Sequence, residues 1–228
     1  MATVADTFRS FFETANTAFR YNLQVFPDTL TAGALLFSLL FQSPPLAALG
    51  GSMILLTFLH PLLAQFTART VSATLGADVD PGLCSGHFPG VSYDQLLSMS
   101  SERTFGALNR SGWPSYYSVF MGFLGAWVSA LPVIYYKEQA ASPKRKTAST
   151  VGLIVLALVL LMMIVYRIGS GCDTPLGVFV GLMAGGLVGG LLVTFLAWIS
   201  ERRLTNLLAY PLIRGRAGDG KPIYVCQK

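Results

Sequence analysis

The chain has 228 residues, of which 53% are hydrophobic and only 12% are charged. A water-soluble globule of this size needs more polar side chains to cover its surface, so the composition favours a bilayer as the solvent. The formal net charge of +5 comes from 16 Lys and Arg residues against 11 Asp and Glu residues, and the basic ones cluster between long uncharged stretches. We therefore expect a multi-pass integral membrane protein and not a soluble binding module.

The N-terminal segment, residues 1–27, has the pattern of an amphipathic helix. Its apolar residues recur at steps of three and four, while charged residues fall on other faces. These apolar positions are Phe8, Phe11, Phe12, Ala15, Phe19 and Leu23. We predict a helix that lies in the membrane interface. A helix that packs on its own bundle or on a partner protein remains the alternative.

Two apolar stretches follow this segment. Thr29 to Phe41 is short for a crossing, because a helix needs about 20 apolar residues to cross about 30 Å of hydrocarbon. We predict a short span here, and half of a re-entrant hairpin is the alternative. Leu46 to Phe66 is long enough to span, and the pair His60-Pro61 predicts a kink or a frayed end because proline lacks a backbone donor.

The loop over residues 67–113 contains a short motif found in a class of enzymes. Ser85-Gly86-His87 is similar to one motif of the membrane lipid phosphatases. That family also needs a second, downstream histidine as nucleophile and upstream basic motifs for phosphate, and no histidine follows His87. The three cysteines and two histidines are too widely spaced for a zinc site or a dithiol motif. We therefore predict no enzyme, no cofactor and no metal site.

Three long apolar stretches complete the membrane part of the chain. They are Pro114 to Tyr136, Thr147 to Tyr166 and Thr174 to Ile199, and none of them contains Asp, Glu, Lys or Arg. Proton-coupled transport needs ionisable groups at membrane depth, so these uncharged spans argue against it. The sequence predicts an all-α polytopic transmembrane helix bundle of four to five spans over residues 28–200.

The last stretch holds a regular glycine pattern. Gly177, Gly181, Gly185 and Gly189 recur every four residues and so fall on one face of a helix. In lipid, small residues let two helix backbones approach closely, and this contact is a main source of helix association. We predict a helix-packing face here. Its partner is either another helix of the same chain or a helix of a second copy.

The distribution of charge predicts how the chain is threaded through the membrane. The loop 137–146 and the tail 201–228 fall on one side, with ten of the sixteen Lys and Arg residues and a net charge of +7. The loop 67–113 and the turn 167–173 fall on the other side, with four basic and five acidic residues. By the positive-inside rule, the C-terminus faces the cytoplasm and the loop 67–113 faces away from it.

This threading brings two cysteines to the same side of the membrane. Cys84 and Cys172 both lie on the non-cytoplasmic side, whereas Cys226 lies in the tail. Disulfides persist in oxidising compartments, so a bond between Cys84 and Cys172 is topologically allowed, and we hypothesise it. Spacing alone does not bring the two cysteines within bonding distance.

Basic and aromatic residues on the predicted cytoplasmic side form a candidate contact surface. They are Lys144, Arg145, Lys146, Arg214, Arg216, Lys221 and Tyr224. We predict that these residues contact anionic lipid headgroups or a partner on the cytoplasmic side, and nucleic acid is not expected. The alternative is that the cluster in the loop serves only as a topology signal.

The C-terminal tail carries a family resemblance. The segment Gly218 to Cys226, which follows a glycine-rich final span, resembles the ends of membrane proteins of the nucleocytoplasmic large DNA viruses. The resemblance covers only the last quarter of the chain. It implies a component of the internal membrane of a virion that lies beneath the capsid and contacts minor capsid proteins.

The sequence thus supports two functions. The first is a structural membrane protein that packs through its glycine face, as a homo-oligomer or within a larger assembly of membrane or capsid proteins, and docks through its basic tail. The alternative is a channel or transporter subunit.

Overall fold

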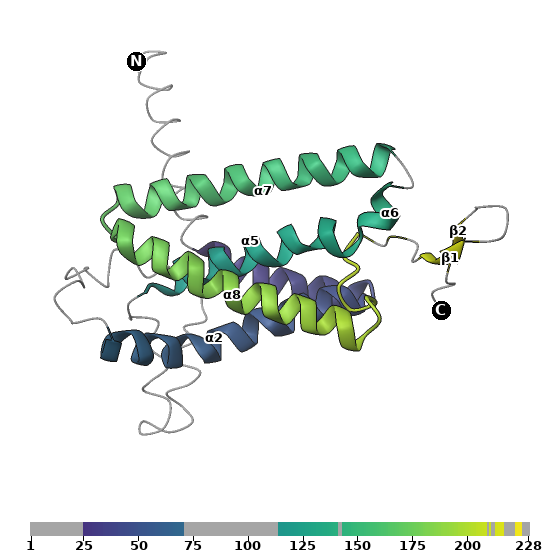
Figure 1. Ribbon diagram of the computed structural model, residues 1–228. Helices are drawn as coiled ribbons and strands as arrows, with labels where there is room; N and C mark the ends of the chain where they lie inside the picture. The colour runs from purple at the N-terminus through teal and green to yellow at the C-terminus, as the bar shows by residue number, and fades with distance from the viewer. Residues whose placement is uncertain are drawn as a thin grey trace, which may run out of the picture.

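The computed structural model describes residues 25–70, 114–140, 143–208, 210, 213–216 and 222–224. Four long helices form a bundle within this part of the chain: α2 (Pro44–Thr70), α5 (Tyr116–Ile134), α7 (Pro143–Gly169) and α8 (Pro175–Ile199). They run roughly along one common axis (Figure 1). Each is long and apolar enough to cross a membrane. The predicted all-α, multi-span bundle is therefore confirmed.

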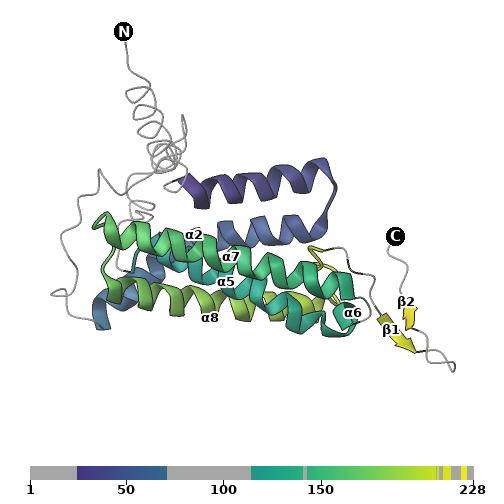
Figure 2. The ribbon, with the colours of Figure 1, turned by 90° about the horizontal axis from the view of Figure 1, so that it is seen from above.

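A shorter apolar helix, Val25–Leu40, precedes α2. It begins within the segment for which the sequence predicts an interfacial helix, and the rest of that segment lies outside the described residues. At 1.5 Å per residue it is about 24 Å long. The chain reverses at Gln42, which has a φ of +48°, and α2 then returns beside the shorter helix (Figure 2). The predicted four to five spans correspond to four long helices and this shorter one.

The two helices of this hairpin touch along their length. The hydroxyl of Thr31 lies 3.6 Å from the sulfur of Met53, and the side chain of Leu35 lies over Gly50. Helix α2 then continues through Pro61 to Thr70, so it does not end at that proline. A frayed end at His60-Pro61 is therefore not what the structure shows.

Helix α5 is the centre of the bundle. It begins at Tyr116 because Ser115 caps it: the Ser115 hydroxyl accepts the amide N–H of Ser118 at 3.3 Å. Every residue from Tyr116 to Leu124 is buried, and the largest fully buried side chains include Phe120, Phe123 and Trp127. The hydrophobic core therefore surrounds α5.

Helices α7 and α8 pack on α5 to different extents. A short helix, α6 (Tyr136–Ala140), leads into α7, where only Met163 and Arg167 are buried. Exposed apolar side chains line α7 from Val151 to Ile168, which suits lipid and not water. Helix α8 begins after the N-cap Thr174, with Pro175 in its first turn, and packs closely on α5.

The tail adds a small antiparallel hairpin outside the bundle. Strand β1 (Ile213–Arg216) pairs with β2 (Pro222–Tyr224), with Arg216 opposite Pro222 and Ile213 opposite Tyr224. The hairpin projects beyond the end of the bundle where α7 begins (Figures 1 and 2). The sequence analysis did not predict these strands.

Candidate functional site

The glycine face of α8 packs on α5. A Cβ atom added to Gly185 would overlap the backbone of Val119, and one added to Gly189 would overlap the backbone of Phe123. A Cβ atom added to Gly181 would collide with Ser118. The helix-packing partner that the sequence left open is therefore within the same chain. Gly177 is buried in the first turn of α8, where its N–H bonds the hydroxyl of the N-cap Thr174 at 3.1 Å.

Helix α5 contributes a glycine of its own to this contact. A Cβ atom added to Gly122 would overlap the backbone of Leu182. The sequence analysis missed this residue, although Ser118 and Gly122 stand four residues apart and so repeat the small-residue spacing of α8. Gly190 is different, because an added Cβ atom would have no neighbour within 4 Å among the described residues.

A buried ion pair joins the end of α7 to the start of α8. The Arg167 Nε atom donates to the Asp173 carboxylate at 2.8 Å, and both side chains are almost fully buried. The hydroxyl of Ser118 donates to the same carboxylate at 3.3 Å, and the Arg167 guanidinium lies 4.1 Å from the centre of the Tyr117 ring. A buried pair is tolerated when further polar contacts surround it, as here. The cluster fixes the α7–α8 turn on the start of α5.

This cluster corrects one predicted boundary. The sequence placed the end of the span at Tyr166 and put Arg167 in a turn, whereas α7 runs from Pro143 to Gly169 and includes it. Arginine is costly in lipid, but here it is turned inward to an acidic partner at the end of the bundle. An ion pair of this kind has no signature in the sequence beyond the six-residue separation of its two members.

Helix α2 contacts the same end of α5. The Nε2 atom of His60 lies 2.9 Å from the carbonyl oxygen of Pro114, and the hydroxyl of Thr57 lies 2.9 Å from the hydroxyl of Tyr116. His60 is buried and packs edge-on against the Tyr116 ring. In the described part of the chain, no group of three His, Cys, Asp or Glu residues could hold a metal ion. Through its contacts with Pro114 and Tyr116, His60 contributes to helix packing.

Cys172 lies in the turn beside this ion pair. It is buried and forms a disulfide. Its partner is outside the described residues, as are the two other cysteines of the chain, Cys84 and Cys226. The pairing of Cys172 with Cys84 stays a prediction.

At the opposite end, a folded segment caps the bundle. The phenol of Tyr135 is hydrogen-bonded to the backbone carbonyl of Arg202 and lies 2.8 Å from the Thr205 hydroxyl. Burial raises the pKa of Tyr135 above its usual value near 10. The buried Glu138 carboxylate of α6 pairs with Arg202 at 3.5 Å. This segment, Ser200 to Tyr210, is called the tail cap below.

A second set of contacts closes the tail cap. The side-chain amide of Asn206 donates to the carbonyl of Tyr210 at 2.7 Å and accepts the Tyr210 N–H at 2.8 Å. The Tyr210 ring packs on Tyr135 with the ring centres 5.7 Å apart. The start of the tail is therefore folded onto the bundle. In the sequence, only the neighbouring Tyr135 and Tyr136, where the predicted span ends, mark this position.

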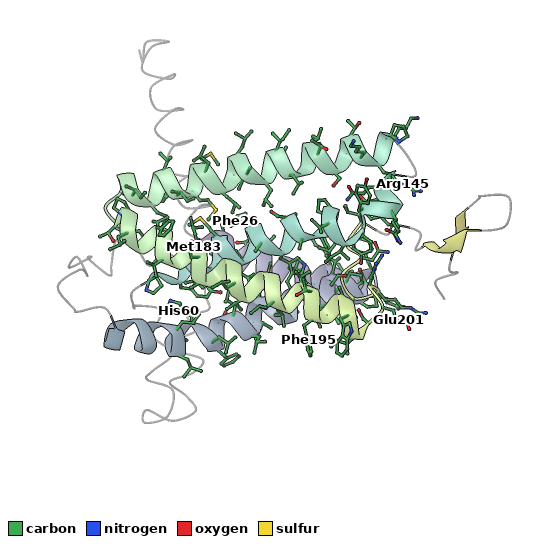
Figure 3. The ribbon with its side chains drawn as sticks, viewed as in Figure 1. Phe26, His60, Arg145, Met183, Phe195 and Glu201 are labelled. Carbon is green, nitrogen blue, oxygen red and sulfur yellow. The ribbon has the colours of Figure 1, made fainter. Side chains whose placement is uncertain are left out.

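The predicted contact residues that the structure describes lie at this same end of the bundle. Lys144 and Lys146 are exposed in the first turn of α7, and Arg145 is half-buried. No acidic residue accompanies them in that turn, so they oppose the helix dipole. Arg145 and Glu201 lie at one end of the bundle, away from His60 (Figure 3). Arg214, Arg216 and Tyr224 belong to the β1–β2 hairpin, and Lys221 lies outside the described residues.

Comparisons with protein-family models, with curated proteins and with solved structures found no match to this chain. The geometry of the bundle is therefore the basis for the functional argument. That geometry consists of a closely packed α5–α8 pair, a buried ion pair at one end and the tail cap with its basic surroundings at the other.

Proposed function

We propose that this chain is a structural integral membrane protein that holds a partner at its basic end. The residues that touch the partner are those of the predicted contact surface. This end faces the cytoplasmic side, because it carries most of the basic residues of the chain. In this role the chain acts as a scaffold. Two features support this role: the bundle is closely packed, and the tail is held in place where it leaves the bundle.

The interior of the bundle supports a scaffold over a channel. Phe120, Phe123 and Trp127 fill the space around α5, and backbone contact between α5 and α8 closes the remaining side. Aromatic side chains packed at this density leave no path for hydrated ions through the described core. A transport function would need a pathway elsewhere, so the channel alternative is not proposed.

The observation that carries the proposal is the tail cap. Contacts with Tyr135 and Glu138 hold the tail on the bundle at three positions, Arg202, Thr205 and Tyr210. The tail therefore does not leave α8 as a flexible linker. The β1–β2 hairpin therefore emerges from a fixed point. A hairpin held in this way can dock a partner at a defined angle, because less conformational freedom is lost on binding.

The chemistry of the hairpin indicates the kind of partner. Arg214 and Arg216 are two residues apart in β1, and the tail as a whole is basic. An acidic protein surface on the cytoplasmic side fits this charge. If the resemblance of the tail to viral membrane proteins holds, the partner is a minor capsid protein or another protein of the virion internal membrane.

Deletion of the tail beyond the cap tests the proposal. A chain that ends after Tyr210 keeps the tail cap, so it should insert in the membrane and elute from size exclusion as the full chain does. We expect it to lose incorporation into the larger assembly that the full chain enters, measured by co-sedimentation after mild detergent extraction. A matched control replaces the exposed Lys137, which lies outside the predicted contact surface, by Gln and keeps the tail. Unchanged incorporation of the truncated chain would reject the docking role of the hairpin.

A further inference from the structure

An apolar groove lies between α2 and α8. Its volume of about 380 Å³ is within the range of roughly 300–1,000 Å³ of pockets that hold small ligands. One wall is made of small residues of α2, and the other is made of leucines of α8 and the tail cap. The principal lining residues are Ala47, Ala48, Gly51, Leu192, Leu196 and Leu204.

The groove lies where a hydrocarbon chain would be the surrounding medium. Both α2 and α8 are long and apolar enough to span the membrane, and the groove opens outward between them. A Cβ atom added to Gly51 would have no neighbour within 4 Å, so the space above this residue is open. Water finds too few polar partners in such a slot, whereas an acyl chain matches its chemistry.

The end of the groove carries the charge that selects a lipid. Leu204 lines the groove and directly follows Arg203, which is exposed. Among the described residues of the segments 137–146 and 200–210, six are basic and two are acidic, which leaves a net charge of +4. The buried acid, Glu138, is already paired with Arg202. A positive interface of this kind attracts anionic headgroups.

We propose that the groove between α2 and α8 binds one acyl chain of an anionic phospholipid, whose headgroup lies against Arg203. The small residues of α2 give the slot its width, and the basic end supplies the selectivity for charge. The proposal does not depend on the docking function of the tail.

Lipid binding to the purified full chain tests this proposal. Delipidated protein in mild detergent is titrated with phosphatidylglycerol or with phosphatidylcholine of the same acyl chains, and bound lipid is counted by native mass spectrometry. We expect one tightly held phosphatidylglycerol and about tenfold weaker binding of phosphatidylcholine, which corresponds to about 1.4 kcal/mol. Equal binding of the two lipids by the unaltered chain would overturn the proposal.

Two glycine variants separate the groove from the rest of the surface. Gly51→Leu places a side chain in the open slot and should weaken phosphatidylglycerol binding about tenfold or more. Gly152→Leu is the matched control, because an added Cβ atom there also has no neighbour within 4 Å, but it lies on the exposed face of α7. Equal lipid binding by the two variants would count against the groove. A change from dimer to monomer in Gly51→Leu, with lipid binding unchanged, would instead identify a second copy as the occupant.

A third variant tests the headgroup contact without altering the bundle. Arg203 is exposed, so Arg203→Gln should fold normally. It should bind phosphatidylcholine as the unaltered chain does and lose most of the preference for phosphatidylglycerol. Retention of the full preference would place the headgroup elsewhere and overturn the assignment to Arg203.

Discussion

A single glycine, Gly185, shows how closely α8 packs against α5. Its position faces the backbone of Val119, with no room for even a methyl group. Contact between two backbones gives dispersion attraction over many atoms, which is the main gain available to apolar helices in lipid. The four-residue spacing in the sequence predicted this face correctly. It could not identify α5 as the partner, because the spacing describes only one of the two surfaces.

Enlarging this glycine should separate the two helices. Gly185→Leu overpacks the contact, and overpacking typically costs about 1–3 kcal/mol. We therefore expect a lower midpoint of thermal unfolding, which is measured by size-exclusion chromatography of heated samples in detergent. Gly190→Leu is the matched control on the same helix, because its added side chain enters open space. Equal losses in the two variants would mean that α5–α8 contact does not stabilise the bundle.

At the scale of elements, hydropathy found the helices and missed the features at their ends. The long apolar stretches predicted α2, α5, α7 and α8, because uncharged runs of this length are stable in hydrocarbon. Arg167 within α7 and the β1–β2 hairpin were not predicted. The β1–β2 hairpin consists of short strands with weak local signals. The inward position of Arg167 depends on contacts with Asp173 and Tyr117 that form only after folding. The tail cap is of the same kind, since Tyr135 and Thr205 meet only after folding.

The tail cap should weaken at high pH. The folded state holds the proton of Tyr135 more tightly than the unfolded chain, whose tyrosines titrate near pH 10. This contribution is fully present below about pH 10 and is lost as the pH rises through the higher pKa of the folded state. We expect the unfolding midpoint of the unaltered chain to fall between pH 9 and about pH 11.

A pair of neighbouring tyrosines provides the comparison. Tyr135→Phe loses the hydrogen bonds of the phenol, at about 0.5–1.5 kcal/mol each, but its stability should depend less on pH. Tyr136→Phe should keep the original dependence, because Tyr136 is 71% exposed whereas Tyr135 is 1% exposed. If Tyr135→Phe loses stability with pH as steeply as the unaltered chain, burial of this phenol is not the cause.

At the scale of the whole molecule, the two ends of the bundle differ in chemistry. One end is fixed by the Arg167–Asp173 pair beside the disulfide-bonded Cys172. The other end carries exposed lysines and arginines around the tail cap. By the positive-inside rule this asymmetry predicts which way the chain is threaded, and the proposed docking and lipid binding both occur at the basic end. The sequence could predict the asymmetry because it depends on counts of charge, but not the folded tail cap that makes the basic end rigid.

The most direct test of this account is to label the two ends of α7. Lys144, in its first turn, and Ser170, just beyond its last residue, are each replaced by cysteine in a Cys226→Ser background, and labelling is measured relative to that background alone. A membrane-impermeant maleimide is then applied to sealed vesicles whose non-cytoplasmic face is outward. We predict that only Ser170→Cys is labelled before the vesicles are permeabilised, and that both variants are labelled afterwards. Equal labelling of the two in sealed vesicles would contradict a membrane-spanning α7, and labelling of Lys144→Cys alone would contradict the orientation.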